Sequence, residues 1–349
     1  MKPIYILLSM IILIISENII YAQTDVVTGL NGPTGLVLNG NDLYIAESSG
    51  GKISKIDITD STPTAVDVVT GLSGPNGLVL NGNDLYIAEL FGDKISKINI
   101  TDSTPIAIDV VTGIFGPLDL VLNGNDLYIS EFFGNKILKI DVTDPTPIAV
   151  NVITGLNGPS GLALNGNDLY IAELDGNKIS KIDITDPTPI AVEVITVDDV
   201  RTLTFNENDL YFADLELDKI SRIDITDISP TVVDVVMGLN NPNKIILNGN
   251  DLYIAEFSDN LVSKFDIGAL SVDTYLPNKA IKLYPNPASN FIQIQNLTSK
   301  ESYKIYDILG AEIKDGSISN SELIGIRNFT NGLYFLKFDN GITIKFIKE

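Results

Sequence analysis

Neither cysteine nor histidine occurs among the 349 residues of this chain. Without cysteine there is no disulfide, no thiolate metal site and no cysteine nucleophile. Without histidine, Ser-His-Asp triads, histidine-bound zinc and imidazole proton shuttles are excluded as well. Any catalysis must therefore use carboxylate, lysine, tyrosine or hydroxyl chemistry, with or without a hard metal ion.

Positive charge is also scarce, because the chain contains 23 Lys and Arg but 45 Asp and Glu, which gives a net charge of −22. The imbalance lies in residues 23–275, where we count 37 acidic against 13 basic side chains. Residues 276–349 are slightly basic, with 7 acidic and 9 basic side chains. An acidic surface repels phosphate backbones and anionic lipids, so binding to nucleic acid or to a membrane surface is disfavoured.

One short sequence motif recurs along most of the chain, and LNGNDLYIAE at Leu38–Glu47 is an example. The tyrosines at its centre are separated by 42, 42, 42, 41 and 42 residues, and they are Tyr44, Tyr86, Tyr128, Tyr170, Tyr211 and Tyr253. A fixed period of about 40–45 residues is typical of a four-stranded propeller blade.

A single repeat contains four strand-like segments, at residues 35–38, 42–47, 52–59 and 65–72. Asn39-Gly40 suits the tight hairpin between the first two, because both residues tolerate a positive φ. Ile, Val and Thr favour strands, and no apolar residues recur at helical spacing. The repeats are therefore predicted to be all-β.

The two ends of the repeat region predict how it closes. An unattached outer strand, Asp25–Leu30, precedes the first repeat, and the last repeat has no outer strand after Leu261–Ile267. Pairing these two segments would complete a sixth blade and hide two strand edges. We therefore predict a six-bladed β-propeller over residues 24–270.

The N-terminus has the layout of a signal peptide over residues 1–22: Lys2, an apolar stretch at Ile4–Ile15, and the small residue Ala22. A retained membrane anchor is the alternative, but Ser16, Glu17 and Asn18 interrupt the apolar run. No other segment is apolar enough to span a bilayer, so we expect no transmembrane segment in the mature chain.

The repeat ends before residue 276, and the tail differs in composition. Residues 271–282 are predicted to be a linker, and residues 283–349 a small Ig-like β-sandwich. Four sequence features mark the tail in order: YPNP, IYD-x-x-G, NGLYFLK and a basic last strand. They involve Tyr284, Pro285, Asn286, Pro287, Tyr306, Asp307, Gly310, Gly332 and Tyr334.

These features resemble the C-terminal sorting domain of proteins exported by type IX secretion. The resemblance implies export to the periplasm, recognition by the type IX machinery through residues 283–349, and passage across the outer membrane. It places the protein outside a gram-negative bacterium, secreted or on the cell surface. An ordinary Ig-like binding module is the alternative for this domain.

The repeat itself resembles NHL-type six-bladed propellers, through GP-x-GL followed by LYIAE and KI-x-KID. The resemblance covers the whole repeat region but implies no single function, because such folds host enzymes, scaffolds and ligand traps. Antibiotic-lyase propellers depend on histidine, so this chain lacks what their active site needs.

Comparison of the repeats suggests a specialised face. The Asn-Gly hairpins are nearly invariant, whereas the loops between repeats and the second hairpin tips vary. The variable positions include Thr34, Asn76, Leu118, Ser160, Arg201 and Asn243 between repeats, and Leu90, Phe91, Phe132, Phe133, Leu174, Leu215 and Phe257 at the tips. We predict ligand contacts at Phe91, Phe132, Phe133, Leu118, Asn76, Asn243 and Phe257, although drift in loops would also explain the variation.

Two features of this face have alternative interpretations. The apolar tips either form an exposed contact patch or, as is more common, pack against neighbouring blades as core. A carboxylate ends the equivalent strand of every repeat, at Glu47, Glu89, Glu131, Glu173, Asp214 and Glu256. Such a ring could recruit a divalent cation, but copying in each blade favours hydrogen bonds to the hairpin or pairing with Lys52, Lys94, Lys136 or Lys178.

Two functional classes remain open. The first is a secreted binding protein whose unknown extracellular ligand is a protein or a glycan. The second is a metal-dependent lactonase-like hydrolase, for which Asn76, Asp119 and Asn243 are the nearest ligands, although no glutamate occupies an equivalent position. That gap and the regular blades favour binding over catalysis; no cofactor is expected, and a calcium ion stays open.

Overall fold

The computed structural model describes residues 23–268, 282–295, 297, 300–308, 310–320, 322–338 and 343–349. The chain divides into two compact units, residues 1–269 and 270–349, which are considered separately. The predicted signal peptide and nearly all of the predicted linker lie outside the described residues, as does Asn340-Gly341, where the sequence predicts a turn of the tail.

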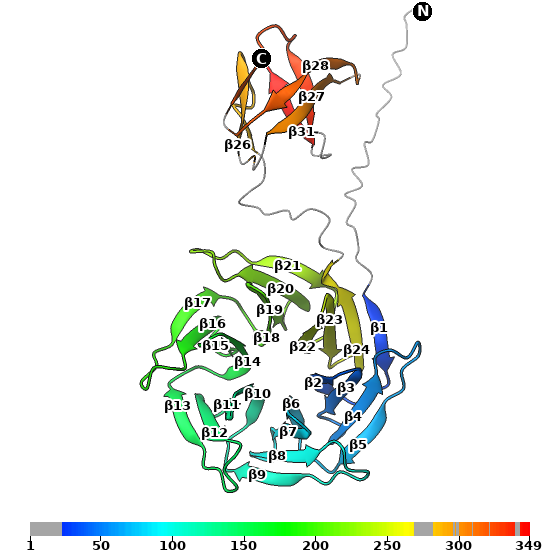
Figure 1. Ribbon diagram of the computed structural model, residues 1–349, viewed down its shortest axis with the longest axis vertical. Helices are drawn as coiled ribbons and strands as arrows, with labels where there is room; N and C mark the ends of the chain where they lie inside the picture. The colour runs from blue at the N-terminus through cyan, green and yellow to red at the C-terminus, as the bar shows by residue number, and fades with distance from the viewer. Residues whose placement is uncertain are drawn as a thin grey trace, which may run out of the picture. The chain divides into compact units, whose positions relative to one another are not determined.

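Six four-stranded antiparallel sheets form a ring in the first unit (Figure 1). Blade 1 contains β2 (Pro33–Asn39), β3 (Asp42–Glu47), β4 (Lys52–Asp57) and β5 (Val66–Thr70). Blade 2 contains β6 (Pro75–Asn81), β7 (Asp84–Glu89), β8 (Lys94–Asn99) and β9 (Ile108–Thr112). Blade 3 contains β10 (Pro117–Asn123), β11 (Asp126–Glu131), β12 (Lys136–Asp141) and β13 (Val150–Thr154).

The other three blades repeat this order. Blade 4 contains β14 (Pro159–Asn165), β15 (Asp168–Glu173), β16 (Lys178–Asp183) and β17 (Val192–Thr196). Blade 5 contains β18 (Val200–Asn206), β19 (Asp209–Asp214), β20 (Lys219–Asp224) and β21 (Val233–Met237). Blade 6 contains β22 (Pro242–Asn248), β23 (Asp251–Glu256), β24 (Leu261–Asp266) and β1 (Thr24–Thr28).

The second strand of each blade explains why the apolar pattern is nearly continuous rather than alternating. In β3, Leu43 and Ile45 pack into the core shared with blade 6, whereas Tyr44 and Ala46 pack into the core shared with blade 2. All four are at most 3% exposed. A strand buried on both faces needs apolar residues at successive positions.

The Asn-Gly hairpin forms with a small difference from the expected turn. Asn39 pairs with Asp42, so the two loop residues are Gly40 and Asn41 rather than Asn39 and Gly40. Gly40 has a φ of 60°. A positive φ at the first loop residue alone is the pattern of a type II′ turn, for which glycine is preferred.

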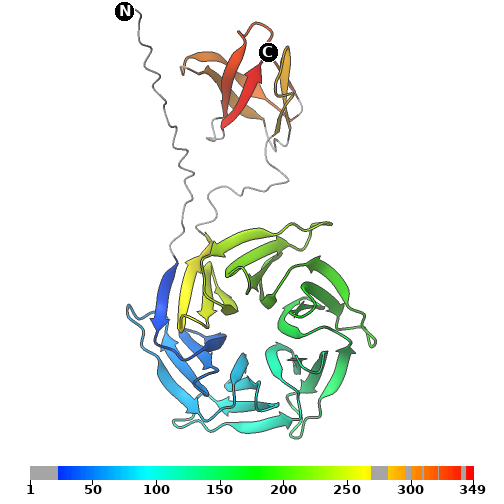
Figure 2. The same cartoon turned by 180° about the vertical axis from the view of Figure 1, so that it is seen from behind.

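The predicted closure of the ring is confirmed. Strand β1 pairs antiparallel with β24, with Thr24 opposite Lys264 and Thr28 opposite Leu261. Both views show the first strand as the outermost strand of the last blade (Figures 1 and 2). Val27 and Leu30 are buried in the core that also contains Tyr253 and Val262.

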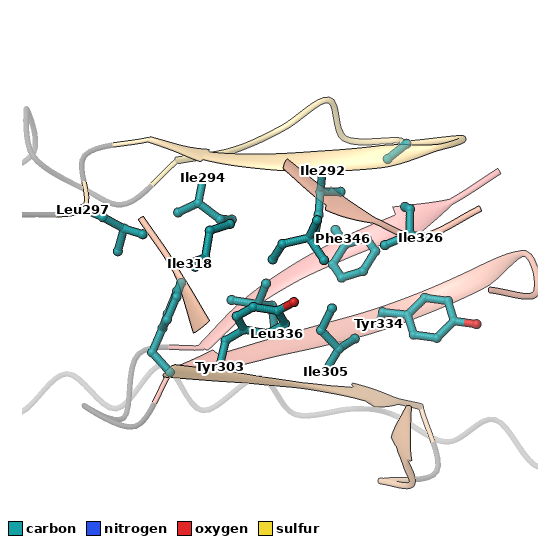
Figure 3. Packing of buried hydrophobic residues seen from close by; sticks show 13 residues of the cluster. Ile292, Ile294, Leu297, Tyr303, Ile305, Ile318, Ile326, Tyr334, Leu336 and Phe346 are labelled. Atoms are coloured by element: carbon teal, nitrogen blue, oxygen red, sulfur yellow. The ribbon is translucent and has the colours of Figure 1, made fainter. Parts of the chain in front are cut away.

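The second unit is a two-sheet sandwich. One sheet has the order β25 (Lys282–Tyr284), β26 (Phe291–Gln295), β29 (Leu323–Gly325). The other has the order β28 (Glu312–Ile318), β27 (Glu301–Asp307), β30 (Gly332–Phe338), β31 (Thr343–Lys348). Ile292 and Ile294 face Ile305, Leu336 and Phe346 across the core (Figure 3), and all five are fully buried. The all-β fold class, a six-bladed propeller followed by a sandwich, is therefore confirmed.

Removing residues 24–30 should lower the thermal midpoint of the propeller by more than 10 °C, which corresponds to a loss of unfolding free energy on the order of several kcal/mol. The deletion exposes one edge of β24 and leaves the buried positions of Val27 and Leu30 empty. Replacing exposed Thr28 with Ala is the matched control and should change little. Calorimetry on the mature chain measures both. An unchanged midpoint after the deletion would show that β1 does not close the ring.

Candidate functional site

Strand register places all variable loops on one face of the propeller. Pro33 is opposite Glu47, and Lys52 is opposite Thr70. The loop before β2, the tip between β3 and β4, and the end of β5 therefore lie at the same end of blade 1. We call the corresponding end of all six blades the loop face.

The ring of carboxylates lies beneath the loop face and binds its backbone. Glu47 accepts a hydrogen bond from the Asn31 amide at 2.7 Å, and Glu131 accepts one from the Phe115 amide at 2.7 Å. Glu89, Glu173 and Glu256 make the same bond to Ser73, Asn157 and Asn240. In each case the donor lies 16 residues upstream, in the loop that enters the blade. The carboxylates thus hold these loops in place.

Four of these carboxylates also pair with lysine. The Nζ–carboxylate distances are 3.4 Å for Lys52–Glu47, 3.6 Å for Lys94–Glu89, 2.9 Å for Lys136–Glu131 and 3.6 Å for Lys178–Glu173. The structural interpretation of the acidic ring is therefore confirmed. The five glutamates accept hydrogen bonds from the entering loop, whereas Asp214 accepts one at 2.9 Å from the backbone amide of Leu217 in its own hairpin tip.

Glu256 differs because Leu261 occupies the position of the pairing lysine. Its carboxylate accepts hydrogen bonds from the Ser263 hydroxyl and the Gln23 side-chain amide, each at 2.5 Å. Burial raises the pKa of Glu256, while the bonds from Ser263 and the Asn240 amide oppose that shift. This member of the ring is buried, and no lysine or arginine among the described residues forms an ion pair with it.

The first strands of the six blades surround the propeller axis, and residues at their second and third positions line a small cavity of about 10 Å³. We call this cavity the channel mouth. Its lining includes Asn76, Leu118, Asp119, Arg201, Thr202, Asn243 and Lys244. A volume of this size admits about one oxygen-sized atom.

An ion pair crosses the channel mouth. The Lys244 ammonium lies 2.7 Å from both oxygens of Asp119, and the two side chains are 12% and 7% exposed. Asp119 belongs to blade 3 and Lys244 to blade 6, which are opposite one another in a ring of six. Glycine occupies the equivalent position in blades 1, 2 and 4, at Gly35, Gly77 and Gly161.

Neighbouring blades fix the position of Asp119. Its Oδ2 accepts a hydrogen bond from the Leu162 amide at 3.0 Å, and its own amide donates to the Ser130 hydroxyl at 2.8 Å. Ser130 in turn donates to the Ser160 carbonyl at 2.7 Å. Gly77 is needed beside this residue, because a Cβ there would stand 2.6 Å from the Cα of Asp119.

Arg201 brings a second positive charge to the channel mouth. Burial lowers the pKa of its guanidinium to about 10, and the charge of Asp119 opposes that shift. The group therefore stays protonated at neutral pH. Within the described part of the chain, the Arg201 side chain makes no hydrogen bond. The adjacent Thr202 is 1% exposed, and its hydroxyl has no hydrogen-bond partner in the segments that the structure describes.

The predicted contact residues fall into two groups. Asn76, Leu118 and Asn243 meet at the channel mouth; Asn76 and Leu118 are buried, and the Asn243 amide donates to Asn241 Oδ1 at 2.7 Å. Sequence reasoning missed Lys244 as a site residue. The available signal was the position after each inter-blade residue, which is acidic only in blade 3 and basic only in blade 6.

The second group lies at the hairpin tips. Phe91 is 71% exposed and Phe133 is 52% exposed, so for these residues the interpretation as core is wrong. Each ring lies over the glycine of the loop entering its own blade, Gly74 or Gly116, which leaves its outer side in solvent. Phe132 and Phe257 are half-buried.

Phe115 is an aromatic residue of the loop face that sequence reasoning missed. It is 55% exposed, and its ring centroid lies 5.2 Å from that of Phe133. Phe132 packs edge-on against Phe133 at 5.1 Å. The loop containing Phe115 also contacts the tip that carries Phe91, because the amides of Gly113 and Ile114 both donate to the Asp93 carbonyl. We call Phe91, Phe115 and Phe133 the aromatic patch.

The described residues hold no group of three or more Asp or Glu side chains arranged to bind a metal ion. They also contain no helix of the length and hydropathy needed to cross a membrane.

The sequence features of the tail have structural roles in the sandwich. Asn286 of YPNP accepts a hydrogen bond from the Ile347 amide at 2.9 Å, which attaches the first segment to the last strand. In IYD-x-x-G, the Gly310 amide donates to the Asp307 carbonyl at 3.0 Å, and Gly310 has a φ of 83°. Tyr334 is buried, and its hydroxyl donates to the Thr330 carbonyl at 2.8 Å.

The other predicted residues of the tail lie nearer the surface. Tyr284 and Tyr306 are half-buried, whereas Pro285, Pro287 and Gly332 are exposed. The motif therefore combines residues that build the sandwich with residues that remain accessible on it.

Residues 282–349 match the model of the secretion system C-terminal sorting domain. The chain therefore carries such a domain at its C-terminus, as its motifs predict. No curated protein matches the sequence.

Solved structures similar to this chain are propellers of diverse function. Virginiamycin B lyase from Staphylococcus aureus is 16% identical, with 70% of this chain and 98% of the other covered and a TM-score of 0.52. A gluconolactonase from Xanthomonas campestris is 14% identical, with 69% and 87% covered and a TM-score of 0.56. A chain of a nidogen/laminin complex is 16% identical, with 58% and 78% covered and a TM-score of 0.50. At these identities the similarity shows the fold alone.

Two members of the carboxylate ring should respond differently to the same substitution. Glu131→Gln leaves Lys136 without its partner and should lower the free energy of unfolding by about 0.5–2 kcal/mol at pH 7. Glu256→Gln removes a buried charge that has no lysine partner, so it should leave that free energy unchanged or raise it. Chemical denaturation of the mature chain measures both.

The pH dependence supplies an internal control. Because the folded-state pKa of Glu256 is raised above its ordinary value of 4.5, the wild type gains stability relative to Glu256→Gln as pH falls through that pKa. It loses this advantage as pH rises toward neutral. Equal destabilisation by both substitutions at pH 7 would contradict the assignment.

Proposed function

We propose that this protein is exported through the type IX pathway and acts outside the cell as a binding protein whose loop face contacts its ligand. The observation that carries the proposal is the aromatic patch. Its three phenylalanines are 52–71% exposed and come from two adjacent blades. The sorting domain supports the route of export.

The exposure of these rings supports a role in ligand contact. Aromatic rings contribute most to stability when they are buried, so a group of exposed rings is more often an interaction site than an accidental feature of the surface. Other blades carry Ser49 and Asp175 at the position of Phe91 and Phe133. The fold therefore does not require an aromatic residue there.

The channel mouth favours binding over lactonase-like hydrolysis. A hard cation needs several oxygen ligands converging on one centre. Asn76, Asp119 and Asn243 do line the same cavity, but the Lys244 ammonium already lies against both oxygens of Asp119. A cation bound to Asp119 would have to displace Lys244 and lie close to Arg201.

The ligand that fits is an extracellular protein or glycan rather than nucleic acid or an anionic membrane. The propeller segment carries most of the excess negative charge of the chain, which opposes polyanions at long range. Phenylalanine rings offer flat apolar surface, which suits sugar faces and apolar side chains alike.

Replacing Phe91, Phe115 and Phe133 together with Ser should weaken binding at least tenfold, since contact rings contribute about 1 kcal/mol or more each. The matched control replaces Ile106, Ile148 and Ile190 with Ser. These residues are 77–80% exposed but belong to the outer loops of the propeller. The measurement is binding of labelled mature chain to a glycan array and to intact cells of the producing bacterium.

Because all six side chains are exposed, both variants should fold with thermal midpoints near that of the wild type. If the aromatic variant bound as well as the wild type, or if the isoleucine variant lost as much binding, the patch would not be the contact surface.

Ending the chain at residue 280 should retain the protein in the periplasm of a host with type IX secretion. The truncation removes all residues of the sorting domain and leaves every blade intact. Immunoblotting of periplasmic and extracellular fractions measures the distribution, and the aromatic variant above serves as a control that should still be exported. Equal extracellular amounts with and without the tail would refute this route.

A further inference from the structure

The charges at the channel mouth do not balance. Asp119 is the carboxylate among the residues that line it, whereas Arg201 and Lys244 both contribute a positive charge. Lys244 engages both carboxylate oxygens of Asp119. Arg201 is left with a longer-range attraction to the same carboxylate. The charged residues that line the channel mouth thus carry a net positive charge on the axis of a strongly acidic propeller.

Hydrogen-bonding capacity is also unused at this point. The Thr202 hydroxyl is buried without a partner, although it lines the same cavity as Arg201. The Asn76 side chain is 6% exposed and, among the described residues, makes no hydrogen bond. A buried hydroxyl without a partner costs free energy, and a bound acceptor would remove that cost.

We infer that the channel mouth is a binding site for an anionic oxygen, which Arg201 attracts and Thr202 and Asn76 contact as hydrogen-bond donors. The cavity of about 10 Å³ fits a single oxygen-sized atom. One oxygen of a carboxylate therefore enters, while the rest of the anion stays outside the channel. A guanidinium with free N–H groups is well suited to this ligand.

This inference deepens the proposed function, because it gives the ligand-binding loop face an anionic anchor beside the aromatic patch. The anion has two sources, a small free ion or a carboxylate on a larger ligand. In either case the acidic propeller repels anions at a distance, so we expect weak binding of free ions with affinities in the millimolar range.

The test uses the mature chain and simple salts at constant ionic strength. A sodium salt of a bulky sulfonate provides the reference, and sodium acetate or sodium chloride replaces it. We expect 100 mM acetate to raise the thermal midpoint by about 2–4 °C relative to the reference salt. A larger rise with acetate than with chloride supports a site for a carboxylate oxygen. An equal rise with chloride would show a site for any small anion and would overturn the assignment to an anionic oxygen.

Arg201→Gln is the decisive variant. Since the Arg201 side chain makes no hydrogen bond to the described residues, its replacement should leave the fold intact and the midpoint in reference salt unchanged or higher. The rise with acetate should disappear. The matched control is Arg222→Gln in the same blade, where the arginine pairs with Asp209 at 2.6 Å, and this variant should keep the rise with acetate.

A milder variant and a second readout cover the case in which Arg201→Gln fails to fold. Thr202→Val preserves shape and charge but removes the hydroxyl, and it should weaken acetate binding at least threefold. Broadening of the ¹³C-acetate signal on titration with folded protein measures this directly. The inference is overturned if the wild type shows no acetate effect, or if Arg201→Gln or Thr202→Val responds like the wild type.

Failure here is distinguishable from failure of the proposed function. The variant with Ser at positions 91, 115 and 133 retains the channel mouth and should keep the full response to acetate. Loss of ligand binding in that variant, together with no acetate effect in the wild type, would overturn the anion site and leave the binding function standing.

Discussion

The burial of both faces of each blade is the constraint on which the rest of this propeller depends. Leu43 and Tyr44 are neighbours in β3, yet they belong to the cores on opposite sides of blade 1. A blade with one neighbour would leave half of these side chains in water, so only a closed ring satisfies all of them. Closure explains why β1 is placed in the last blade, and it brings opposite blades close enough at the axis for Asp119 to reach Lys244.

The carboxylates beneath the loop face fix the backbone of the entering loops and leave the side chains of those loops free to vary. Glu131 holds the loop entering blade 3 through the Phe115 amide, and a backbone bond does not depend on the side chain of its donor. The donor residue is Asn31, Ser73, Phe115, Asn157 or Asn240 in different blades, with the same bond each time. The loop face can therefore change its chemistry without loss of its shape, which is what a recognition surface requires.

The sequence predicts the features that are repeated and misses those that occur once. The repeat period and the unattached strand at Asp25–Leu30 are sufficient to predict the blade count and the ring closure, because every blade packs its two faces against its neighbours in the same way. The exposure of Phe91 and Phe133 could not be predicted, since it depends on the glycine beneath each ring rather than on the pattern. The Asp119–Lys244 pair joins residues 125 positions apart, and only the small radius at the axis brings them together.

Two departures from the repeat in blade 3 are coupled to each other. Asp119 replaces a glycine, and Ser130 replaces the alanine found in the other blades and binds both the Asp119 amide and the next blade. The same blade carries Phe132 and Phe133 at its tip and receives the loop with Phe115. The residues that replace glycine at the channel mouth come from blades 3, 5 and 6, whereas the exposed aromatic tips come from blades 2 and 3. Blade 3 is therefore the sector in which the altered axis and the aromatic tip coincide, as expected if this sector of the ring contacts a ligand and the other blades hold it in place.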